Sequence, residues 1–357
     1  MLRRFLLVLI TPIVLVAAYL SWMLLSASPI DPEGWNPPPA PKLEGVLIPN
    51  LELRQTERLA FGQIVGAEDV AVDARGRIYG GLVDGRIIRL DAAGGGLETF
   101  AETGGRPLGL HFDAAGNLVV ADAAKGLLRV DPDGAVEVLT TESDGLPFRF
   151  TDDLDIASDG RIYFSDASSR FDHHHYLFDL LEARPHGRLL RYDPASGITE
   201  TLLDGLYFAN GIALSQNEDF VLVVETYRYR IQRYWLTGPR AGTAEVFVEN
   251  LPGFPDGVSA NRRGTFWVAC FTVRNTRVDA LHPRPDTKAI LAKLPKIAWP
   301  KPANYGLVIG LDETGRVVRT LQDPGGDIVP QVTSAEEVDG VLYLGNLDKD
   351  FIGRVAL

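Results

Sequence analysis

The chain has 357 residues, of which 46% are hydrophobic and 9% are aromatic. This composition is typical of a folded globular protein and excludes the intrinsically disordered class. The formal net charge of −12 excludes a nucleic-acid partner, because binding to a phosphate backbone requires a basic surface. The single cysteine, Cys270, excludes an intramolecular disulfide, and its place in a strand-like apolar run favours a packing role over a nucleophilic one.

The N-terminal segment differs from the rest of the chain in its hydropathy. Arg3 and Arg4 precede an uncharged run, 5–25, which is long enough to cross a hydrocarbon core as a transmembrane helix. We therefore predict a single-pass membrane anchor over residues 1–27. The two arginines favour a cytoplasmic N-terminus, which would place the following residues on the non-cytoplasmic (periplasmic, lumenal or extracellular) side. A cleaved signal peptide that ends at 26–28 remains the alternative.

A proline-rich stretch, 28–42, follows and is predicted to be an extended, semi-rigid linker to a single domain over 43–357. Within that domain, six segments share a Gly/Asp-rich turn followed by the apolar–polar alternation of antiparallel strands. These segments are 73–81, 113–122, 157–166, 215–225, 260–269 and 338–346. A unit that recurs about every 40 residues predicts an all-β, six-bladed β-propeller. We expect the tail, 351–357, to pair with the start around 46–53 and so remove free sheet edges.

The repeats can be aligned on the glycine of each turn, or on Glu218 in the fourth repeat. Equivalent positions in a propeller are related by rotation, so side chains early in the innermost strands converge on the central channel. Eight residues before the alignment mark, two repeats carry Leu108 and Val332. The other four carry oxygen-bearing side chains, which we predict to bind one divalent cation: Glu68, Asp152, Asn210 and Asp256.

The chemistry of this set favours calcium. Three carboxylates and one carboxamide are hard oxygen ligands, whereas the imidazole and thiolate ligands typical of zinc or copper are absent from the set. Buried carboxylates that lie close together also require a compensating cation, because like charges repel. Two other interpretations stay open: acidic residues that only cap turns, and an ion that only pins the ring. Asp69 and Asp153, which each follow a predicted ligand, are candidates for a second ion or for hydrogen bonds to inner-strand amides.

Several long stretches resemble the strictosidine synthase-like family. They are GRLLRYDP (187–194), LLDGLYFANGIALS (202–215), VETYRYRIQRYWLTGPRAGT (224–243) and LPGFPDGVSANRRGTFWVA (251–269). Shorter phrases are similar to the calcium-binding phrases of paraoxonases and of the gluconolactonase/regucalcin family, which are six-bladed propellers with an axial calcium. These phrases are GAEDVAVD (66–73), FTDDLDI (150–156), FANGIALS (208–215) and FPDGVSA (254–260).

The resemblance implies roles for individual residues. The predicted ligands match those of the catalytic calcium, with Asp152 standing where these families usually carry Asn. Asp256 also matches the candidate general base of gluconolactonase-like enzymes. Asp69 and Asp153 match the region of the structural calcium of paraoxonases.

Two positions depart from the patterns of these families. Thr333 occupies the place where strictosidine synthases carry a catalytic Glu, which argues against the C–N bond-forming condensation. Leu108 stands where paraoxonases carry a histidine, and His111, three residues later, is expected to be an ordinary packing residue.

Two insertions interrupt the repeat. The first, 170–187, contains the consecutive His173, His174 and His175, which do not share one face of a helix or strand and therefore make a poor metal chelate. We expect a solvated loop there, with substrate contact at the channel mouth as the alternative. The second, 274–305, is rich in Pro, Lys and Arg, which is compatible with a substrate lid or with a basic face towards anionic headgroups.

The leading functional hypothesis is a membrane-anchored, calcium-dependent hydrolase of arylesterase or lactonase type that acts on a small ester or lactone. The metal would polarise the carbonyl group while Asp256 activates water. Two alternatives stay open: a non-catalytic, calcium-stabilised binding or scaffold propeller, and a C–N bond-forming lyase of the strictosidine synthase type.

Overall fold

The computed structural model describes residues 2–357, except for the side chains of residues 2–10, 13, 20 and 24. In this part of the chain the strands form six antiparallel four-stranded sheets and one two-stranded hairpin. The first strand of each sheet contacts the first strand of the next sheet, so these strands surround the channel. The prediction of an all-β, six-bladed β-propeller is confirmed.

The first three blades follow one another along the chain, each with its strands in sequence order. Blade one contains β2 (Val70–Val72), β3 (Ile78–Gly81), β4 (Arg86–Leu90) and β5 (Glu98–Glu102). Blade two contains β6 (Pro107–Phe112), β7 (Leu118–Asp122), β8 (Gly126–Val130) and β9 (Val136–Thr140). A short hairpin of β10 (Glu142–Ser143) and β11 (Leu146–Pro147) leads to blade three, which contains β12 (Thr151–Ile156), β13 (Ile162–Asp166), β14 (Gly187–Asp193) and β15 (Ile198–Leu206).

The remaining blades complete the ring. Blade four contains β16 (Ala209–Leu214), β17 (Phe220–Glu225), β18 (Arg230–Trp235) and β19 (Ala244–Val248). Blade five contains β20 (Gly253–Ala260), β21 (Thr265–Val273), β22 (Gly306–Asp312) and β23 (Val317–Asp323). Blade six contains β24 (Ala335–Val338), β25 (Val341–Leu344) and β26 (Ile352–Ala356), and its fourth strand is the N-terminal β1 (Glu57–Leu59).

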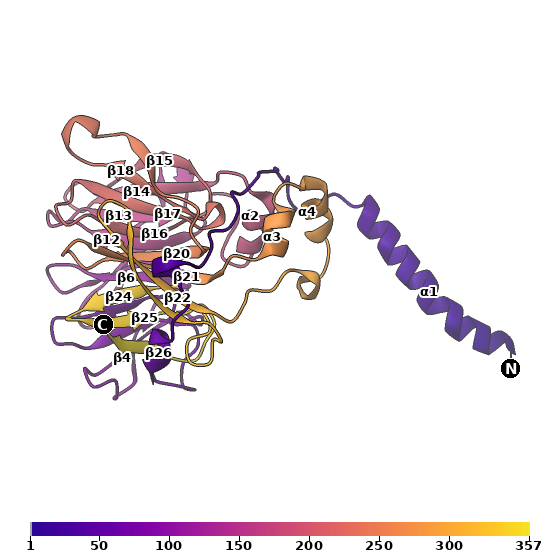
Figure 1. Cartoon of the computed structure of the whole chain (residues 1–357), viewed down its shortest axis with the longest axis horizontal. Helices are drawn as coiled ribbons and strands as arrows, with labels where there is room; N and C mark the ends of the chain where they lie inside the picture. Colours follow the sequence, from indigo (N-terminus) through magenta and orange to yellow (C-terminus); the bar gives the residue numbers. More distant parts are fainter. Residues whose placement is uncertain (1) are drawn as a thin grey trace.

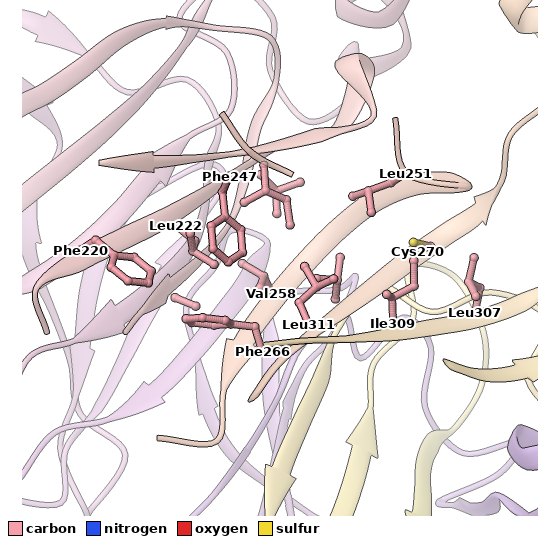
Figure 2. Packing of buried hydrophobic residues seen from close by; sticks show 14 residues of the cluster. Phe220, Leu222, Phe247, Leu251, Val258, Phe266, Cys270, Leu307, Ile309 and Leu311 are labelled. Carbon is pink, nitrogen blue, oxygen red and sulfur yellow. The ribbon is translucent and has the colours of Figure 1, made fainter. Parts of the chain in front are cut away.

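The hydrophobic core lies between adjacent blades. Between blades four and five, for example, Leu222 from β17 and Phe247 from β19 face Phe266 and Ile309 of β21 and β22, and all four are buried (Figure 2). Cys270 belongs to the same cluster and is fully buried, which confirms its packing role. The side chains of a strand alternate between the two faces of its sheet, so each blade packs against one neighbouring blade on each face. Every blade therefore depends on two others to bury its apolar side chains.

Ring closure involves both ends of the domain. The tail pairs as expected, but its partner is β1 at 57–59 rather than 46–53, with Leu59 opposite Ile352. The stretch 46–53 was predicted wrongly because it forms two 3₁₀ turns, η1 (Gly45–Leu47) and η2 (Glu52–Gln55). There Asn50 accepts a hydrogen bond from the Gln322 backbone N–H at 3.0 Å, which holds this stretch against the outer strand of blade five.

Both insertions fold over one end of the channel. The first contains α2 (Tyr176–Glu182), and the second contains α3 (Thr276–Leu281), α4 (Pro285–Leu291) and η5 (Lys296–Ala298). We call 170–187 and 274–305 together the lid, because α2 packs against α4 and their side chains share one hydrophobic cluster. Two more 3₁₀ turns, η3 (Thr226–Arg228) and η4 (Gly238–Arg240), lie in blade four.

The N-terminal helix, α1 (Leu2–Leu25), extends away from the propeller on the side of the lid (Figure 1). No helix in the described part of the chain is both long and apolar enough to cross a membrane. The predicted membrane-spanning run, 5–25, lies partly outside the described side chains. The predicted linker, 28–42, contacts the lid, where Ile30 is buried among lid side chains.

The closure of blade six gives a test of the ring. Ile352 is fully buried between blades six and one, whereas Val318 is about half exposed on the outer strand of blade five. We expect Ile352→Ala to lower the free energy of unfolding by about 2–5 kcal/mol, and Val318→Ala by about 0.5 kcal/mol or less. Urea denaturation followed by circular dichroism measures both. Equal losses for the two variants would contradict the closure shown by the register of β1 and β26.

Candidate metal centre

A chamber of about 180 Å³ lies at the end of the channel beneath the lid. All four predicted ligands line it: Glu68, Asp152, Asn210 and Asp256. Glu68 lies two residues before β2, and the other three lie early in β12, β16 and β20. The rotational equivalence of the inner strands therefore brings these side chains to one end of the channel, as the alignment of the repeats predicts.

The other two equivalent positions differ. Leu108 lines the chamber as an apolar residue, and Val332 is fully buried in the core between blades five and six. The acidic and amide side chains of the chamber consequently come from blades one, three, four and five, and blades two and six contribute none of the set.

The carboxylates of the chamber are held in a water-poor space. Glu68 is 8% exposed and Asp152 is 4% exposed. Burial raises the pKa of both carboxyl groups well above the ordinary range, and the neighbouring negative charge of Asp256 raises each further. Burial likewise raises the pKa of Asp256 to about 7, against a hydrogen bond from Asn210 that lowers it. Each of these carboxyl groups therefore gains stability from a proton or from a cation.

Arg106 is a charged residue of the chamber that the alignment of the repeats does not reveal. The residue is 5% exposed and lines the chamber, and its guanidinium donates to the carbonyl oxygens of Gly66 at 2.8 Å and Gly81 at 3.2 Å. Its positive charge lowers the pKa of Glu68 and of Asp152 and so compensates part of their repulsion. The available sequence signal is its place two residues before Leu108, at the start of the inner strand of blade two.

The predicted ligands all carry oxygen atoms of the kind that calcium prefers. Asp152 Oδ2 is buried and has no hydrogen-bond partner in the described structure, so one carboxylate oxygen in the chamber lacks the stabilisation that buried acceptors normally have. Asn210 Nδ2 donates to Asp256 Oδ1, which fixes these two side chains relative to each other. Among the described residues, no three His, Cys, Asp or Glu side chains form a group that could hold a metal ion. Coordination by these four residues therefore stays a prediction.

The walls of the chamber are apolar. Phe150 and Phe208 meet edge to face at 5.3 Å between ring centroids, and Phe208 stacks on Tyr227 at 4.7 Å. Phe254 and the α2 residue Leu177 complete this wall. The chamber thus combines a polar, acidic floor with aromatic walls, an arrangement that suits an organic molecule with one polar reacting group.

The three consecutive histidines separate in the structure. His173 lines the chamber, where burial lowers its pKa, so its imidazole is predominantly neutral. His174 and His175 are exposed, and His175 Nδ1 lies 2.8 Å from Asp172 Oδ1. The loop is therefore solvated at two of the three positions, and the third is placed at the channel mouth.

A second, smaller cavity of about 30 Å³ lies further along the inner strands and is lined by Asp69 and Asp153. Asp69 Oδ2 accepts a hydrogen bond from the Leu110 amide at 2.9 Å, and Asp153 Oδ2 accepts one from the Ile212 amide at 2.8 Å. Each carboxylate therefore joins its own blade to the inner strand of the next. Their predicted use as ligands of a second ion stays a prediction.

Two further residues have defined positions. His111 also lines the second cavity, and its Nε2 lies 3.9 Å from Asp155 Oδ1. Asp155 Oδ1 also accepts a hydrogen bond from the Arg262 guanidinium. Thr333 is buried, and its hydroxyl donates to the Glu68 carbonyl oxygen at 2.6 Å. Thr333 therefore stabilises the backbone of the predicted ligand Glu68. It carries no carboxylate that could act as a catalytic acid or base.

Comparison with known proteins places the chain in a family. The family model described as strictosidine synthase matches residues 152–239, and the model described as strictosidine synthase-like, N-terminal, matches residues 45–90. Adipocyte plasma membrane-associated protein of Rattus norvegicus is 39% identical over 94% of this chain and 95% of its own length. The Homo sapiens protein of the same name is also 39% identical, over 96% of this chain and 88% of its own.

A plant relative agrees with this assignment, and solved structures share the fold of the chain. Protein STRICTOSIDINE SYNTHASE-LIKE 10 of Arabidopsis thaliana is 38% identical over 81% of this chain and 84% of its own. A gluconolactonase from Xanthomonas campestris shares the fold with a TM-score of 0.62 at 18% identity, over 93% of this chain and 98% of that one. The calcium-binding protein regucalcin from Agrobacterium tumefaciens has a TM-score of 0.58 at 16% identity, over 84% and 90%. The chain belongs to the strictosidine synthase-like family.

Proposed function

We propose that this chain is a calcium-dependent hydrolase that acts on an ester or lactone with an apolar body and is attached to a membrane by its N-terminal segment. The observation that carries this proposal is the convergence of three carboxylates and one carboxamide on the floor of an aromatic chamber. Solved structures with the same fold include proteins named gluconolactonase and calcium-binding regucalcin, which supports the choice of reaction and ion.

The proposed mechanism assigns a task to each part of the chamber. Calcium held by Glu68, Asp152, Asn210 and Asp256 would supply a Lewis acid for the carbonyl oxygen of the substrate. Asp256 would accept the proton of the attacking water, because its carboxyl group lines the chamber together with the other proposed calcium ligands. The aromatic walls around Phe150 and Phe208 would orient the apolar part of the substrate and exclude bulk water.

Arg106 has a supporting task in this mechanism. Its side chain is tied to backbone carbonyl oxygens of blade one, so its charge stays fixed next to the acidic floor. A fixed cation limits the number of uncompensated negative charges near the reacting carbonyl. The acidic residues that line the chamber are those of the predicted ligand set, and Thr333 supplies no carboxylate there, so the C–N bond-forming alternative receives no support.

Membrane attachment is the second element of the proposal. It is supported by the uncharged run at 5–25 and by relatives that are named plasma membrane-associated. The preceding Arg3 and Arg4 favour an orientation with the propeller on the non-cytoplasmic side.

The catalytic role of Asp256 can be tested with the full chain in detergent micelles. We expect hydrolysis of phenyl acetate and of alkyl lactones at saturating calcium, and loss of that activity with a chelator. Asp256→Asn keeps an oxygen ligand but removes the base, so kcat/KM should fall about 10²- to 10⁴-fold. Asp204→Asn, at an exposed position in β15, is the matched control and should leave kcat/KM unchanged.

Two outcomes would contradict the hydrolase proposal. One is the absence of turnover for every ester and lactone tested, together with a large drop in melting temperature on chelation; that result would favour the scaffold alternative. The other is turnover that Asp256→Asn leaves intact.

The raised carboxyl pKa values predict an unusual pH dependence of stability. Between the ordinary carboxyl range and about pH 7, the calcium-free folded chain binds more protons at Asp256, Glu68 and Asp152 than the unfolded chain does. The free energy of unfolding contributed by these groups therefore falls as the pH rises through that window. Calcium competes with these protons, so its stabilisation should be larger at pH 7.5 than at pH 5.5.

The measurement is the melting temperature with chelator and with calcium at both pH values. Burial lowers the pKa of His282 to about 3, so the contribution of His282 to the free energy of unfolding rises with pH and opposes that of the carboxyl groups. The prediction is therefore tested on the difference between the parent chain and Asp152→Asn. The variant should show a smaller dependence on pH and a smaller effect of calcium, whereas Asp204→Asn should behave as the parent. Identical pH profiles for Asp152→Asn and the parent would refute the prediction.

A further inference from the structure

The outer side of the lid carries a groove of about 660 Å³ that is separate from the chamber. Apolar and basic side chains both line it, among them Leu281, Leu291, Ile297, Trp299, Arg277 and Lys301. Ile297 is 83% exposed, although isoleucine is among the residues most often buried in folded proteins. A groove lined by both apolar and cationic side chains matches an amphiphile whose head is anionic.

The charge of the lid differs in sign from that of the whole chain. The insertion 274–305 contains seven Lys and Arg residues but only two Asp and Glu residues, whereas the chain has a net charge of −12. Arg277, Lys296 and Lys301 are exposed and form no ion pair with any described side chain. Unpaired cations on an otherwise acidic protein attract anionic surfaces, and each one near an anionic bilayer strengthens binding about five-fold.

The groove lies next to the point where the chain leaves towards α1. Lys293 Nζ donates to the Ser26 carbonyl oxygen, one residue beyond the end of that helix. Further along, the Trp35 amide donates to the His282 carbonyl oxygen at 3.1 Å, and the two rings lie 4.7 Å apart. These contacts fix the lid to the segment that follows α1, and α1 projects from the same side of the molecule (Figure 1).

The groove and the chamber share a wall. Asn275, Pro300 and Lys301 line both spaces, and Asn275 Nδ2 donates to the Lys301 carbonyl oxygen at 3.3 Å. A surface bound in the groove would therefore lie one layer of protein away from the aromatic chamber.

We propose that the outer face of 274–305 docks onto the headgroup layer of an anionic lipid bilayer. Ile297 and Ile290 enter the boundary between headgroups and acyl chains, and Arg277, Lys296 and Lys301 lie among the lipid phosphates. The inference deepens the proposed membrane attachment, on which it rests, and is independent of the proposed hydrolase chemistry. Docking would place the lid, and the chamber behind it, at the surface from which an apolar substrate is supplied.

A fluorescent probe on the full chain tests this inference. Cys270 is fully buried, so Ile297→Cys offers the accessible thiol for a nitrobenzoxadiazole label. The protein is reconstituted into vesicles of phosphatidylcholine alone or with phosphatidylglycerol, and emission and quenching by brominated lipid are measured. We expect a blue shift and quenching for the Ile297 label in the vesicles that contain phosphatidylglycerol, and loss of both at high salt.

Matched variants separate the lid from other membrane contacts. A label at Ile198→Cys, which is 64% exposed on an outer strand of the propeller, should stay in a water-like environment. Lys296→Glu combined with Lys301→Glu should weaken the response of the Ile297 label at least ten-fold. The control is Arg75→Glu, which alters an exposed cation in the turn after β2. Glu68 and the chamber lie at the other end of that strand, so this variant should leave the response of the Ile297 label unchanged.

Three results would overturn the inference. The Ile297 label could remain water-like on vesicles to which the chain is bound, or respond equally to neutral and anionic bilayers. It could also respond as strongly to monomeric short-chain phosphatidylglycerol as to vesicles, which would make the groove a site for a soluble ligand. None of these results would depend on whether esters are hydrolysed.

Discussion

The mutual repulsion of Glu68, Asp152 and Asp256 is the constraint around which the rest of the site is arranged. Six inner strands meet at the axis, and rotation carries equivalent side chains to one place whatever their charge. Burial strengthens the repulsion because water no longer screens it. Arg106 offsets part of it, and the hydrogen bond from Asn210 to Asp256 offsets another part. Asp152 Oδ2 has no hydrogen-bond partner, so part of the repulsion stays uncompensated there. The proposed calcium would supply the missing positive charge.

The propeller and the common chamber of the four candidate ligand residues could be predicted from sequence because both follow from local repetition. The turn glycines Gly76, Gly116 and Gly160 have φ values of 76°, 84° and 86°, a region that favours glycine, so they mark the same place in each blade. Glu218 takes that place in the fourth repeat with φ 56°, which is why the register continued without a glycine. Counting back the same number of residues from each turn therefore identifies the channel positions without any knowledge of distant contacts.

Features that depend on contacts between distant segments could not be predicted in this way. The closing partner of the tail depends on which N-terminal segment reaches blade six, and the 3₁₀ turns near Asn50 remove 46–53 from that role. Arg106 lies outside the repeat register, and its importance follows from carbonyl oxygens of another blade. The contact of 28–42 with the lid likewise depends on the buried Ile30, for which a proline-rich composition gives no signal.

The pairing of β1 with β26 also has a consequence for biosynthesis. The two strands of this pair lie at opposite ends of the domain, with Glu57 opposite Arg354. A nascent chain therefore cannot complete blade six until its last residues have left the ribosome, and until then blades one and five each lack a neighbour. Contacts of such long sequence separation slow folding and leave strand edges exposed to aggregation. The strand edges of blades one and five therefore stay unpaired with blade six throughout translation, and premature termination near the C-terminus would yield an open ring.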